Sequence, residues 1–441
     1  MSQKNAVIFG AGAIGLAFLG DLLDRAGYAM IFLDVREDII SALRARGYYE
    51  IHIVQRGEDR LRRICRVSAI NSGAFATDPR VREAVCGALA EADFIITAAG
   101  ERALVPIAPI LAAGLARRYG LSEGRDGVVT ACGGPCRSLQ YSNPPIPLHS
   151  INIMCCENIA DPAAVLRDGI QRHLPEAAWC ALEPRLGIAR SVISRMTPVV
   201  TSLEHIVTEP YDEIPVEAAA WKGPPPDIQG LRLVENFPAY KVRKLIMHNM
   251  THATAAYLGY FLGKRDVGEA MQDARIVAVT RRTMKEAMEA LIAEFGLPRA
   301  EQEAHGEDLI RRYDNPALGH AVANVARDPI RKLSPGDRMV TAARLAEKHG
   351  LPRGAIMFGM ALALNYDHPA DAEAQELQRR LAAEGLPAVL KSVCGVAPTE
   401  PLASRLSDEY EAARRAIAAS RQAGNPQPTE DLVDALVRKW T

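Results

Sequence analysis

The stretch Asn5–Gly15, NAVIFGAGAIG, decides the fold of this 441-residue chain. It begins as a short apolar strand and continues with Gly10, Gly12 and Gly15 in G-x-G-x-x-G spacing. In a strand–turn–helix unit the first glycine permits a tight turn, the second lets a diphosphate approach the backbone, and the third lets helix and strand pack closely. A helix predicted from Ala13 would aim the N–H groups of its first turn, including that of Ile14, at the diphosphate.

A second apolar strand, YAMIFLDV, carries Asp34 at its end, 24 residues beyond Gly10. A carboxylate at this point binds the ribose hydroxyls of the adenosine and favours NAD over NADP. Arg36 could accept a 2′-phosphate, so NADP remains possible, although Asp34 would repel that phosphate. The alternative is a glycine-rich turn in another α/β fold.

Two further segments end where a doubly wound sheet holds its ligands. The segment ADFIITAAG, residues 92–100, has a buried-strand pattern and predicts that Ala98, Ala99 and Gly100 pass close to the nicotinamide half of the cofactor. The segment INIMCCEN, residues 151–158, places Asn158 at a strand end that faces the active cleft. The alternatives are an ordinary strand-to-helix turn and a turn-forming asparagine.

The remaining pattern indicates an α/β chain in two parts. Three strand-like segments, 48–54, 191–200 and 208–218, accompany a Gly- and Pro-rich loop at 131–150 and a linker at 221–230. Beyond Leu231 apolar residues recur at helical spacing, with breaks at 314–316 and 327–339. We expect a Rossmann-type doubly wound domain over 1–230, a helical substrate domain over 231–441, and an active cleft between them.

One helix of the second part carries chemically useful side chains. The stretch Tyr240–Leu258, YKVRKLIMHNMTHATAAYL, lacks Pro and Gly and is predicted to be one helix. At roughly 100° per residue, Lys244, Asn249 and His252 fall within an arc of about 140°, spread over about 12 Å. A desolvated lysine can act as a base, a carboxamide can hold an alkoxide, and an imidazole can orient a hydroxyl. The alternative is an amphipathic helix with a polar, solvated face.

Composition excludes several classes of protein. The net charge is −1 and 48% of the residues are hydrophobic, with no basic excess for nucleic acid and no apolar run long enough to span a membrane. No signal peptide precedes the first strand, so we expect a cytoplasmic protein. The eight cysteines are expected to be free thiols, and Cys132 with Cys136 lacks a second pair at zinc-ligand spacing, so no metal is expected.

Taken together, these motifs resemble the polyol-specific long-chain dehydrogenases, the mannitol dehydrogenase family. The resemblance extends in order over nearly the whole chain. The segments that carry it are GAGAIGLAFLG from Gly10, CCEN at 155–158, SRMTP at 194–198, KLIMHNMTHATAAYLG from Lys244, NPAL at 315–318, RDPIRKLSPGDR from Arg327 and DAEAQEL from Asp371.

The resemblance implies metal-free hydride transfer between a sugar alcohol or polyol phosphate and NAD(P). It implies that Lys244 is the acid/base, that Asn158 and Asn249 hold the reacting oxygen, and that His252 touches the substrate. It also implies a monomer or a weak homo-oligomer. Ala13 and Leu16 stand where the family usually has Asn and Arg, which leaves the choice between NAD and NADP less determined.

A phosphorylated substrate would need cationic partners. The candidates are Arg195, Arg243, Arg331, Lys332 and Arg338, and for each the alternative is a surface or structural salt bridge. Ser194 replaces an Asp that many relatives carry, and the loop at 132–149 looks longer than theirs. The substrate could therefore be mannitol 1-phosphate, another polyol phosphate, a free polyol or a hexuronate.

Two other functions remain open on sequence alone. A 3-hydroxyacid dehydrogenase of the 6-phosphogluconate type also pairs a Rossmann domain with a helical one, although its motif around the lysine differs. A nucleotide-sensing binding protein without turnover would keep the glycine turn and have no use for Lys244 beside the nicotinamide.

Overall fold

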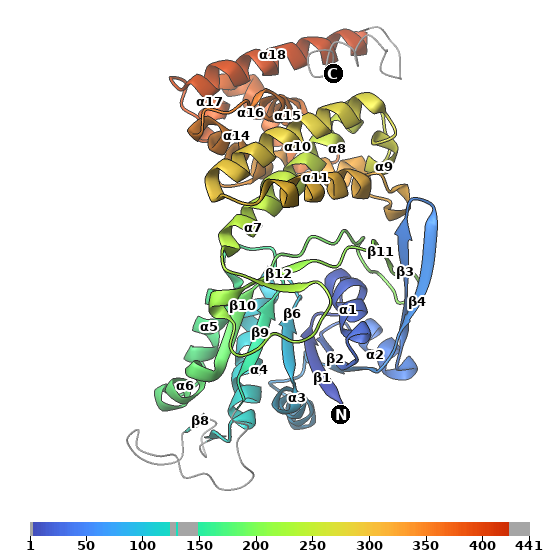
Figure 1. The fold of residues 1–441 in the computed structure, drawn as a ribbon, viewed down its shortest axis with the longest axis vertical. Helices are drawn as coiled ribbons and strands as arrows, with labels where there is room; N and C mark the ends of the chain where they lie inside the picture. Colours follow the sequence, from blue (N-terminus) through green and yellow to red (C-terminus); the bar gives the residue numbers. More distant parts are fainter. Residues whose placement is uncertain (1–2, 124–128, 131–148, 423–441) are drawn as a thin grey trace. The chain divides into compact units, whose positions relative to one another are not determined.

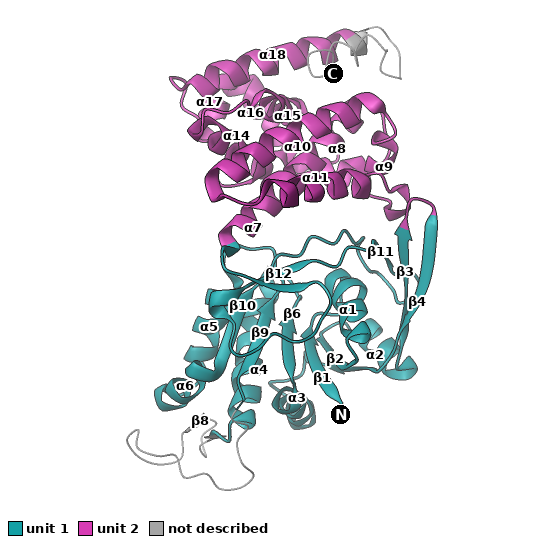
Figure 2. Cartoon of the chain, viewed as in Figure 1, with its two compact units in different colours: residues 1–54, 58–237 teal, residues 55–57, 238–441 magenta. Residues whose placement is uncertain are grey.

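A computed structural model describes residues 3–123, 129–130 and 149–422. The chain forms two compact units: unit 1 comprises Met1–Val54 and Glu58–Phe237, and unit 2 comprises Gln55–Gly57 and Pro238–Thr441 (Figure 2). Unit 1 extends beyond the sequence-based boundary at Gly230. The reason is that strand β13 (Leu231–Val234) pairs in parallel with β12 (Ile214–Glu217), which keeps the chain in unit 1.

Unit 1 is built on a six-stranded sheet with the order β10-β9-β6-β1-β2-β5, in which each neighbouring pair runs parallel (Figure 1). This is the order of a doubly wound dinucleotide-binding sheet, so the predicted fold class is confirmed for unit 1. Its strands, in sheet order, are β10 (Leu186–Arg190), β9 (Ile151–Cys155), β6 (Phe94–Thr97), β1 (Lys4–Phe9), β2 (Tyr28–Asp34) and β5 (Val67–Asn71).

Strand β1 shows why helices cover both faces of this sheet. Val7 and Ile8 point to opposite faces because side chains alternate along a strand. Both are fully buried, Ile8 in one hydrophobic cluster and Val7 in the other. The Ile8 face is covered by η1 (Ala13–Leu19), α1 (Gly20–Arg25) and α2 (Glu37–Arg46), and the Val7 face by α3 (Pro79–Glu91), α4 (Leu104–Arg118), α5 (Pro162–Arg172) and α6 (Glu176–Leu182).

Outside the main sheet the sequence predictions are partly wrong. The predicted strand at 48–54 is present as β3 (Tyr49–Gln55), but the charged stretch after it forms the unpredicted strand β4 (Glu58–Ile64). The segment 191–200 has no strand beyond a single bridge at Ser191, and Pro198 interrupts it. The segment 208–218 contains only the end of β11 (Val207–Thr208) and β12. Short elements complete unit 1: η2 (Glu101–Ala103), β7 (Ser122–Glu123), β8 (Val129–Thr130), η3 (Glu183–Arg185) and η4 (Ala218–Ala220).

From Pro238 onward the described residues of unit 2 form helices and their connections, with one isolated bridge between Asp266 and Ala321, and the predicted helical class is confirmed. The predicted break at 314–316 follows the helix that ends at Tyr313, whereas the predicted break at 327–339 contains the short helix Pro329–Lys332 before another helix begins at Arg338. The elements are α7 (Phe237–Arg243), η5 (Lys244–Met250), α8 (Thr251–Phe261), α9 (Val267–Ala270), α10 (Ala274–Phe295), α11 (Arg299–Tyr313), η6 (Pro316–Leu318), α12 (Val322–Ala326), α13 (Pro329–Lys332), α14 (Arg338–Lys348), α15 (Gly354–Asn365), α16 (Ala372–Glu384), α17 (Leu386–Ser392) and α18 (Pro401–Gln422).

The helix predicted at 240–258 is present but is not a regular α-helix. Elements α7, η5 and α8 follow one another without a break, with right-handed helical dihedrals at both Arg243 and Thr251. We refer to Phe237–Phe261 as the 237–261 helix and to Lys244–Met250 as its π-segment. Among the helices that the structure describes, none is long and apolar enough to cross a membrane.

Candidate active site

The glycine turn of unit 1 has the geometry that a bound diphosphate requires. Gly10 has a φ of +107°, and a Cβ there would lie 2.5 Å from the carbonyl oxygen of Ala98. A Cβ on Gly15 would lie 2.0 Å from the carbonyl oxygen of Gly10. At Gly12, by contrast, no atom of the described residues comes within 4 Å of such a Cβ. The first and third glycines therefore serve packing, whereas the second leaves open space in front of the turn.

Asp34 fastens the end of β2 to the same turn. Its Oδ2 accepts a hydrogen bond from the Ala11 N–H at 2.7 Å, and its Oδ1 accepts from the N–H groups of Val35 and Arg36 at 2.7 and 2.9 Å. The Arg36 guanidinium donates to the carbonyl oxygens of Ala11 and Val200, at 2.6 and 3.3 Å. Arg36 is thus drawn toward the glycine turn.

The ends of β6 and β9 meet through a buried carboxylate that the sequence analysis missed. Glu157 accepts from the Thr97 hydroxyl at 2.8 Å and from the Ala99 N–H at 3.2 Å, and burial raises the pKa of its carboxyl group. These contacts fix the turn Ala98–Gly100, in which Gly100 has a φ of +87°. The next residue, Asn158, is exposed.

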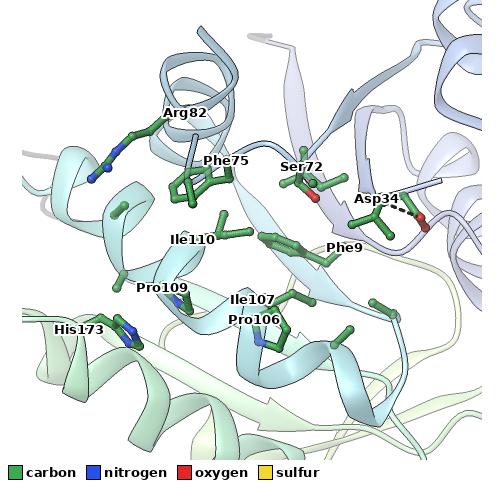
Figure 3. A pocket seen from close by; sticks show the side chains of 18 of the residues that line it. Phe9, Asp34, Ser72, Phe75, Arg82, Pro106, Ile107, Pro109, Ile110 and His173 are labelled. Atoms are coloured by element: carbon green, nitrogen blue, oxygen red, sulfur yellow. Dashed lines mark hydrogen bonds between the residues drawn. The ribbon is translucent and has the colours of Figure 1, made fainter. Parts of the chain in front are cut away.

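A cavity of about 790 Å³ opens beside these elements (Figure 3). Asp34 and Phe9 lie toward one end, and Arg82 and His173 toward the other. Its wall is mostly apolar and includes Val35, Ser72, Phe75, Ala99, Pro106, Ile107 and Ile110. A mostly apolar cavity of this size, with a few polar groups at its rim, is typical of a small-molecule site.

The residues of unit 1 fit a dinucleotide. The open space at Gly12 has room for a diphosphate, and the cavity beside Asp34 has room for an adenosine. Residues Ala13 and Ile14 begin the helix that follows the turn, in the π-helical segment Ala13–Leu19. A nicotinamide cofactor would be held by Gly10, Gly12, Ala13, Ile14, Gly15, Asp34, Ala98, Ala99 and Gly100, the set that the sequence predicts.

In unit 2 the π-segment changes the predicted geometry of the polar residues. A π-bulge accommodates about one extra residue in a helical turn. Residues five apart across it are therefore placed like residues four apart in an α-helix, where they are neighbours on the surface. Lys244, Asn249 and His252 then follow an i, i+4, i+7 pattern within an arc of about 60°, rather than the predicted arc of about 140°. The three side chains consequently share one stripe of the helix.

The Lys244 amine has a pKa below the usual value for lysine. Its pKa is lowered to about 8, first because it is desolvated and second because the positive charge of Arg338 opposes protonation. A lysine with its usual pKa would be protonated in nearly all molecules at neutral pH. The lowered pKa gives Lys244 a substantial neutral fraction, as proton abstraction requires.

His252 presents an available ring nitrogen. Its Nε2 is buried and has no hydrogen-bond partner among residues 3–123, 129–130 and 149–422. The ring stacks on Tyr313, with centroids 4.8 Å apart and planes 11° apart. Burial, reinforced by His320, lowers the pKa of the imidazole well below its usual value. A neutral imidazole held in this way can accept or donate one hydrogen bond to a ligand.

The predicted substrate cations differ in what they contact. Arg338 reaches the backbone carbonyl oxygen of Asn249 at 3.5 Å and pairs with Asp337 at 2.8 Å. Lys332 is buried and donates to the carbonyl oxygen of Arg327, and burial together with Arg338 lowers its pKa to about 7. Arg331 is half-exposed and pairs with Asp328 and Asp337, each at 3.3 Å.

Arg195 has a different environment in unit 1. Its side chain is 1% exposed and contacts Asp21 at 3.0 Å and Asp212 at 2.8 Å. It also donates to the carbonyl oxygens of Ala17 and Tyr211, at 2.9 and 2.6 Å. This arrangement engages most of the guanidinium within unit 1. It favours a structural role over the predicted contact with substrate.

Among the described residues, no group of three or more His, Cys, Asp or Glu side chains could hold a metal ion. Cys132 and Cys136, together with most of the predicted loop at 131–150, lie outside the described residues. The remaining six cysteines form no disulfide within the described residues.

Sequence reasoning missed Tyr313, His320 and Glu157, and the first two belong to no local motif. Glu157 stands inside CCEN and could have been selected from that resemblance. Tyr313 and His320 contact His252 only after α11 and the residues that follow it have packed against the 237–261 helix.

Two domain families match this chain. The mannitol dehydrogenase Rossmann domain matches residues 4–132, and the mannitol dehydrogenase C-terminal domain matches residues 236–413. Together with the doubly wound sheet and the helical unit, these matches define a polyol dehydrogenase. The chain belongs to the mannitol dehydrogenase family.

Its relatives extend over almost the whole chain. A mannitol-1-phosphate 5-dehydrogenase from Geobacillus thermodenitrificans is 34% identical over 412 residues, which is 92% of this chain and 98% of that protein. The enzyme of the same name from Bacillus subtilis is 33% identical and covers 90% of this chain and 97% of its own length.

Solved structures share the fold at lower identity. A D-sorbitol dehydrogenase in substrate-free form matches with a TM-score of 0.72 and 16% identity, covering 99% of this chain and 95% of that chain. A Pseudomonas fluorescens mannitol 2-dehydrogenase, solved with NAD and D-mannitol, matches with a TM-score of 0.64 and 14% identity, covering 96% and 95%.

Proposed function

We propose that this protein transfers hydride between NAD and a secondary alcohol of a polyol phosphate, with Lys244 as acid/base and without a metal. The observation that carries the proposal is the arrangement in unit 2. One stripe of the 237–261 helix holds Lys244, Asn249 and His252, and the amine of Lys244 has a pKa lowered to about 8. Mannitol 1-phosphate is the first substrate to test, because relatives at 33–34% identity are mannitol-1-phosphate 5-dehydrogenases.

In the oxidative direction Lys244 Nζ removes the proton of the reacting hydroxyl. Bound NAD, held by the glycine turn and Asp34 of unit 1, would supply the acceptor for the hydride that leaves the carbon as its carbon–oxygen bond becomes a carbonyl. The carboxamides of Asn158 and Asn249 donate hydrogen bonds to the oxygen as its negative charge develops. In the reductive direction the Lys244 ammonium returns the proton to the forming alkoxide.

The phosphate of the substrate would pair with cations of unit 2. Arg338 and Lys332 both influence the pKa of His252, so they lie near the proposed substrate residues. Phosphate would raise the pKa of Lys332 from about 7 and keep the amine charged when the ligand binds. We assign Arg331 a smaller role because two carboxylates already neutralise it.

A second candidate substrate class is the free polyols. The pairing of Arg338 with Asp337 and the pairs of Arg331 support this alternative, because both guanidinium groups already have carboxylate partners. A free polyol would require hydrogen-bonding groups and no strong cation.

The experiment is a panel of mannitol 1-phosphate, other hexitol phosphates, hexuronates and free hexitols, each with NAD or NADP, followed by the absorbance of the reduced cofactor. We expect the largest kcat/KM for a hexitol phosphate with NAD. Lys244→Ala should reduce kcat by about 10²–10⁴-fold and leave NADH binding intact. Lys285→Ala, an exposed lysine on α10, is the matched control. Turnover by Lys244→Ala at the wild-type rate would overturn the assigned base.

A further inference from the structure

We infer that Tyr313 is a positioning residue whose hydroxyl holds open the π-segment Lys244–Met250 and so sets the alignment of Lys244 with Asn249 and His252. The inference rests on the proposed role of Lys244. It concerns a residue that touches neither cofactor nor reacting atoms in the proposed mechanism. Tyr313 is the last residue of α11, and the turn that it is proposed to control belongs to another helix.

The hydroxyl of Tyr313 contacts this turn at more than one point. Tyr313 is 2% exposed, and its hydroxyl donates to the carbonyl oxygen of His248 at 2.8 Å. The same hydroxyl lies 2.9 Å from Oγ1 of Thr251, whose own hydroxyl donates to the carbonyl oxygen of Met247. Two side-chain hydroxyls thus serve two successive carbonyl groups of the π-segment.

These carbonyl groups need partners because a π-bulge disturbs the i→i−4 ladder of an α-helix. A buried carbonyl without a partner is destabilising, because it has lost its hydrogen bonds to water. The backbone N–H of Thr251 also donates to the His248 carbonyl oxygen, but this hydrogen bond spans only three residues and does not belong to the i→i−4 ladder. The hydroxyls of Tyr313 and Thr251 therefore offset the cost of the wide turn and favour it over a regular helix.

If the π-segment became a regular α-helix, the relative orientation of Lys244, Asn249 and His252 would change. In a regular α-helix, Asn249 and His252 would be rotated by about 100° relative to Lys244. The arc that contains the three side chains would widen from about 60° to about 140°. Lys244 would then leave the surroundings that lower its pKa, in which burial acts first and Arg338 second, with His248 also close enough to interact with it.

Unit 1 contains a similar arrangement, a π-helical segment supported by a tyrosine hydroxyl, in the helix that follows the glycine turn. The helix that follows the glycine turn begins with the π-helical segment Ala13–Leu19. The buried Tyr49 hydroxyl donates to the Leu16 carbonyl oxygen at 2.7 Å, and Arg195 donates to that of Ala17 at 2.9 Å. In each unit, then, a buried tyrosine from another element supports a π-turn beside the residues proposed to act.

Tyr313 makes a second contact that the test has to separate from the first. Its ring stacks on His252, with centroids 4.8 Å apart. Tyr313→Phe keeps this stack and removes only the hydroxyl. Tyr366→Phe is the matched control, because the Tyr366 hydroxyl is buried and has no hydrogen-bond partner within the described parts of the chain. Removing a buried hydroxyl without a partner is neutral or stabilising.

The experiment measures kcat, KM, NADH affinity and the pH dependence of kcat for both variants. For Tyr313→Phe we expect kcat to fall about ten- to hundredfold, the scale of a displaced catalytic group, with unchanged NADH affinity. The limb of the pH profile that reports Lys244 should move above about 8, toward the usual pKa of lysine. Tyr366→Phe should match the wild type in all four measurements.

A crystal structure of Tyr313→Phe provides a readout that does not depend on activity. We expect residues 244–250 to form a regular α-helix; a π-segment that persists would overturn the inference, as would wild-type kcat together with an unmoved pH limb. If Tyr313→Phe does not fold, Thr251→Val removes the companion hydroxyl at constant shape and is expected to act in the same direction. An active Lys244→Ala would refute the proposed base instead, so the two failures are distinguishable.

Discussion

The positive charge of Arg338 acts on Lys244, where it adds to burial in lowering the pKa of the amine to about 8. The same guanidinium reaches the backbone of Asn249 at 3.5 Å and is oriented by Asp337 at 2.8 Å. Arg338 therefore affects the protonation of Lys244 and also contacts the backbone of the helix to which Lys244 belongs. This relationship leads to predictions about pH and about Arg338 itself.

The two directions of the reaction should depend on pH with opposite signs. Oxidation requires neutral Lys244, so kcat for alcohol oxidation should rise with pH and level off above about 8. Reduction requires the ammonium form, so its kcat should fall as pH rises through the same value. Initial rates in both directions between pH 6 and about 10 test this prediction. A limb near the usual pKa of lysine in both directions would contradict it.

Replacing Arg338 by Gln should have two separable effects. The loss of the positive charge removes one cause of the lowered Lys244 pKa, so the limb of the pH profile should move upward. The loss of a charge-assisted contact should raise KM for a hexitol phosphate by about tenfold or more. KM for a free hexitol should change less. Arg265→Gln is the control, since this side chain is 87% exposed; equal effects on both substrates would argue against a phosphate partner.

The second and third glycines of the turn should respond differently to one added methyl group. In Gly12→Ala the new Cβ meets no described atom within 4 Å, so Tm should be unchanged while NADH affinity falls at least about tenfold, or about 1.4 kcal/mol. In Gly15→Ala the Cβ would lie 2.0 Å from the Gly10 carbonyl oxygen, so Tm should fall. Thermal unfolding and NADH titration of both variants provide the comparison. A Gly12→Ala variant with normal NADH affinity would contradict the placement of the diphosphate at Gly12.

Arg195→Met should destabilise the protein and leave substrate selectivity unchanged. The substitution leaves Asp21 and Asp212 without one buried cation, a change that typically costs about 3–5 kcal/mol. Arg63→Met is the control, because the side chain of Arg63 is 57% exposed in its pair with Glu50. Chemical denaturation and KM for the phosphorylated substrate are the measurements. A stable variant with a raised KM would instead support the substrate contact predicted from sequence.

Local spacing is enough to predict the geometry of the glycine turn and of the strand end beside it. Gly10, Gly12 and Gly15 lie within six residues, and their roles follow from which of them can bear a side chain. Asp34 lies at the end of the next strand, where the doubly wound topology places it beside the turn. The parallel sheet itself followed from short apolar runs that end in small residues.

Other features depend on contacts between distant segments. The arc calculated for Lys244 and His252 assumed 3.6 residues per turn, whereas the hydroxyl of Tyr313, on α11, supports a wider turn. The segment around Arg195 looked like a strand, but it is held by carboxylates from elsewhere in the chain rather than by a ladder of backbone bonds. Neither partner can be identified from a local window of sequence.

The π-segment also bears on attempts to engineer this enzyme. A regular helix is the more favourable backbone for most sequences, so the wide turn depends on the hydroxyls of Tyr313 and Thr251 to remain the favoured form. Substitutions within 244–250 that are chosen only to strengthen helix formation should make the protein more heat-resistant and slower. At this turn a substitution that raises Tm is expected to lower kcat, so selection for thermal stability would select against activity.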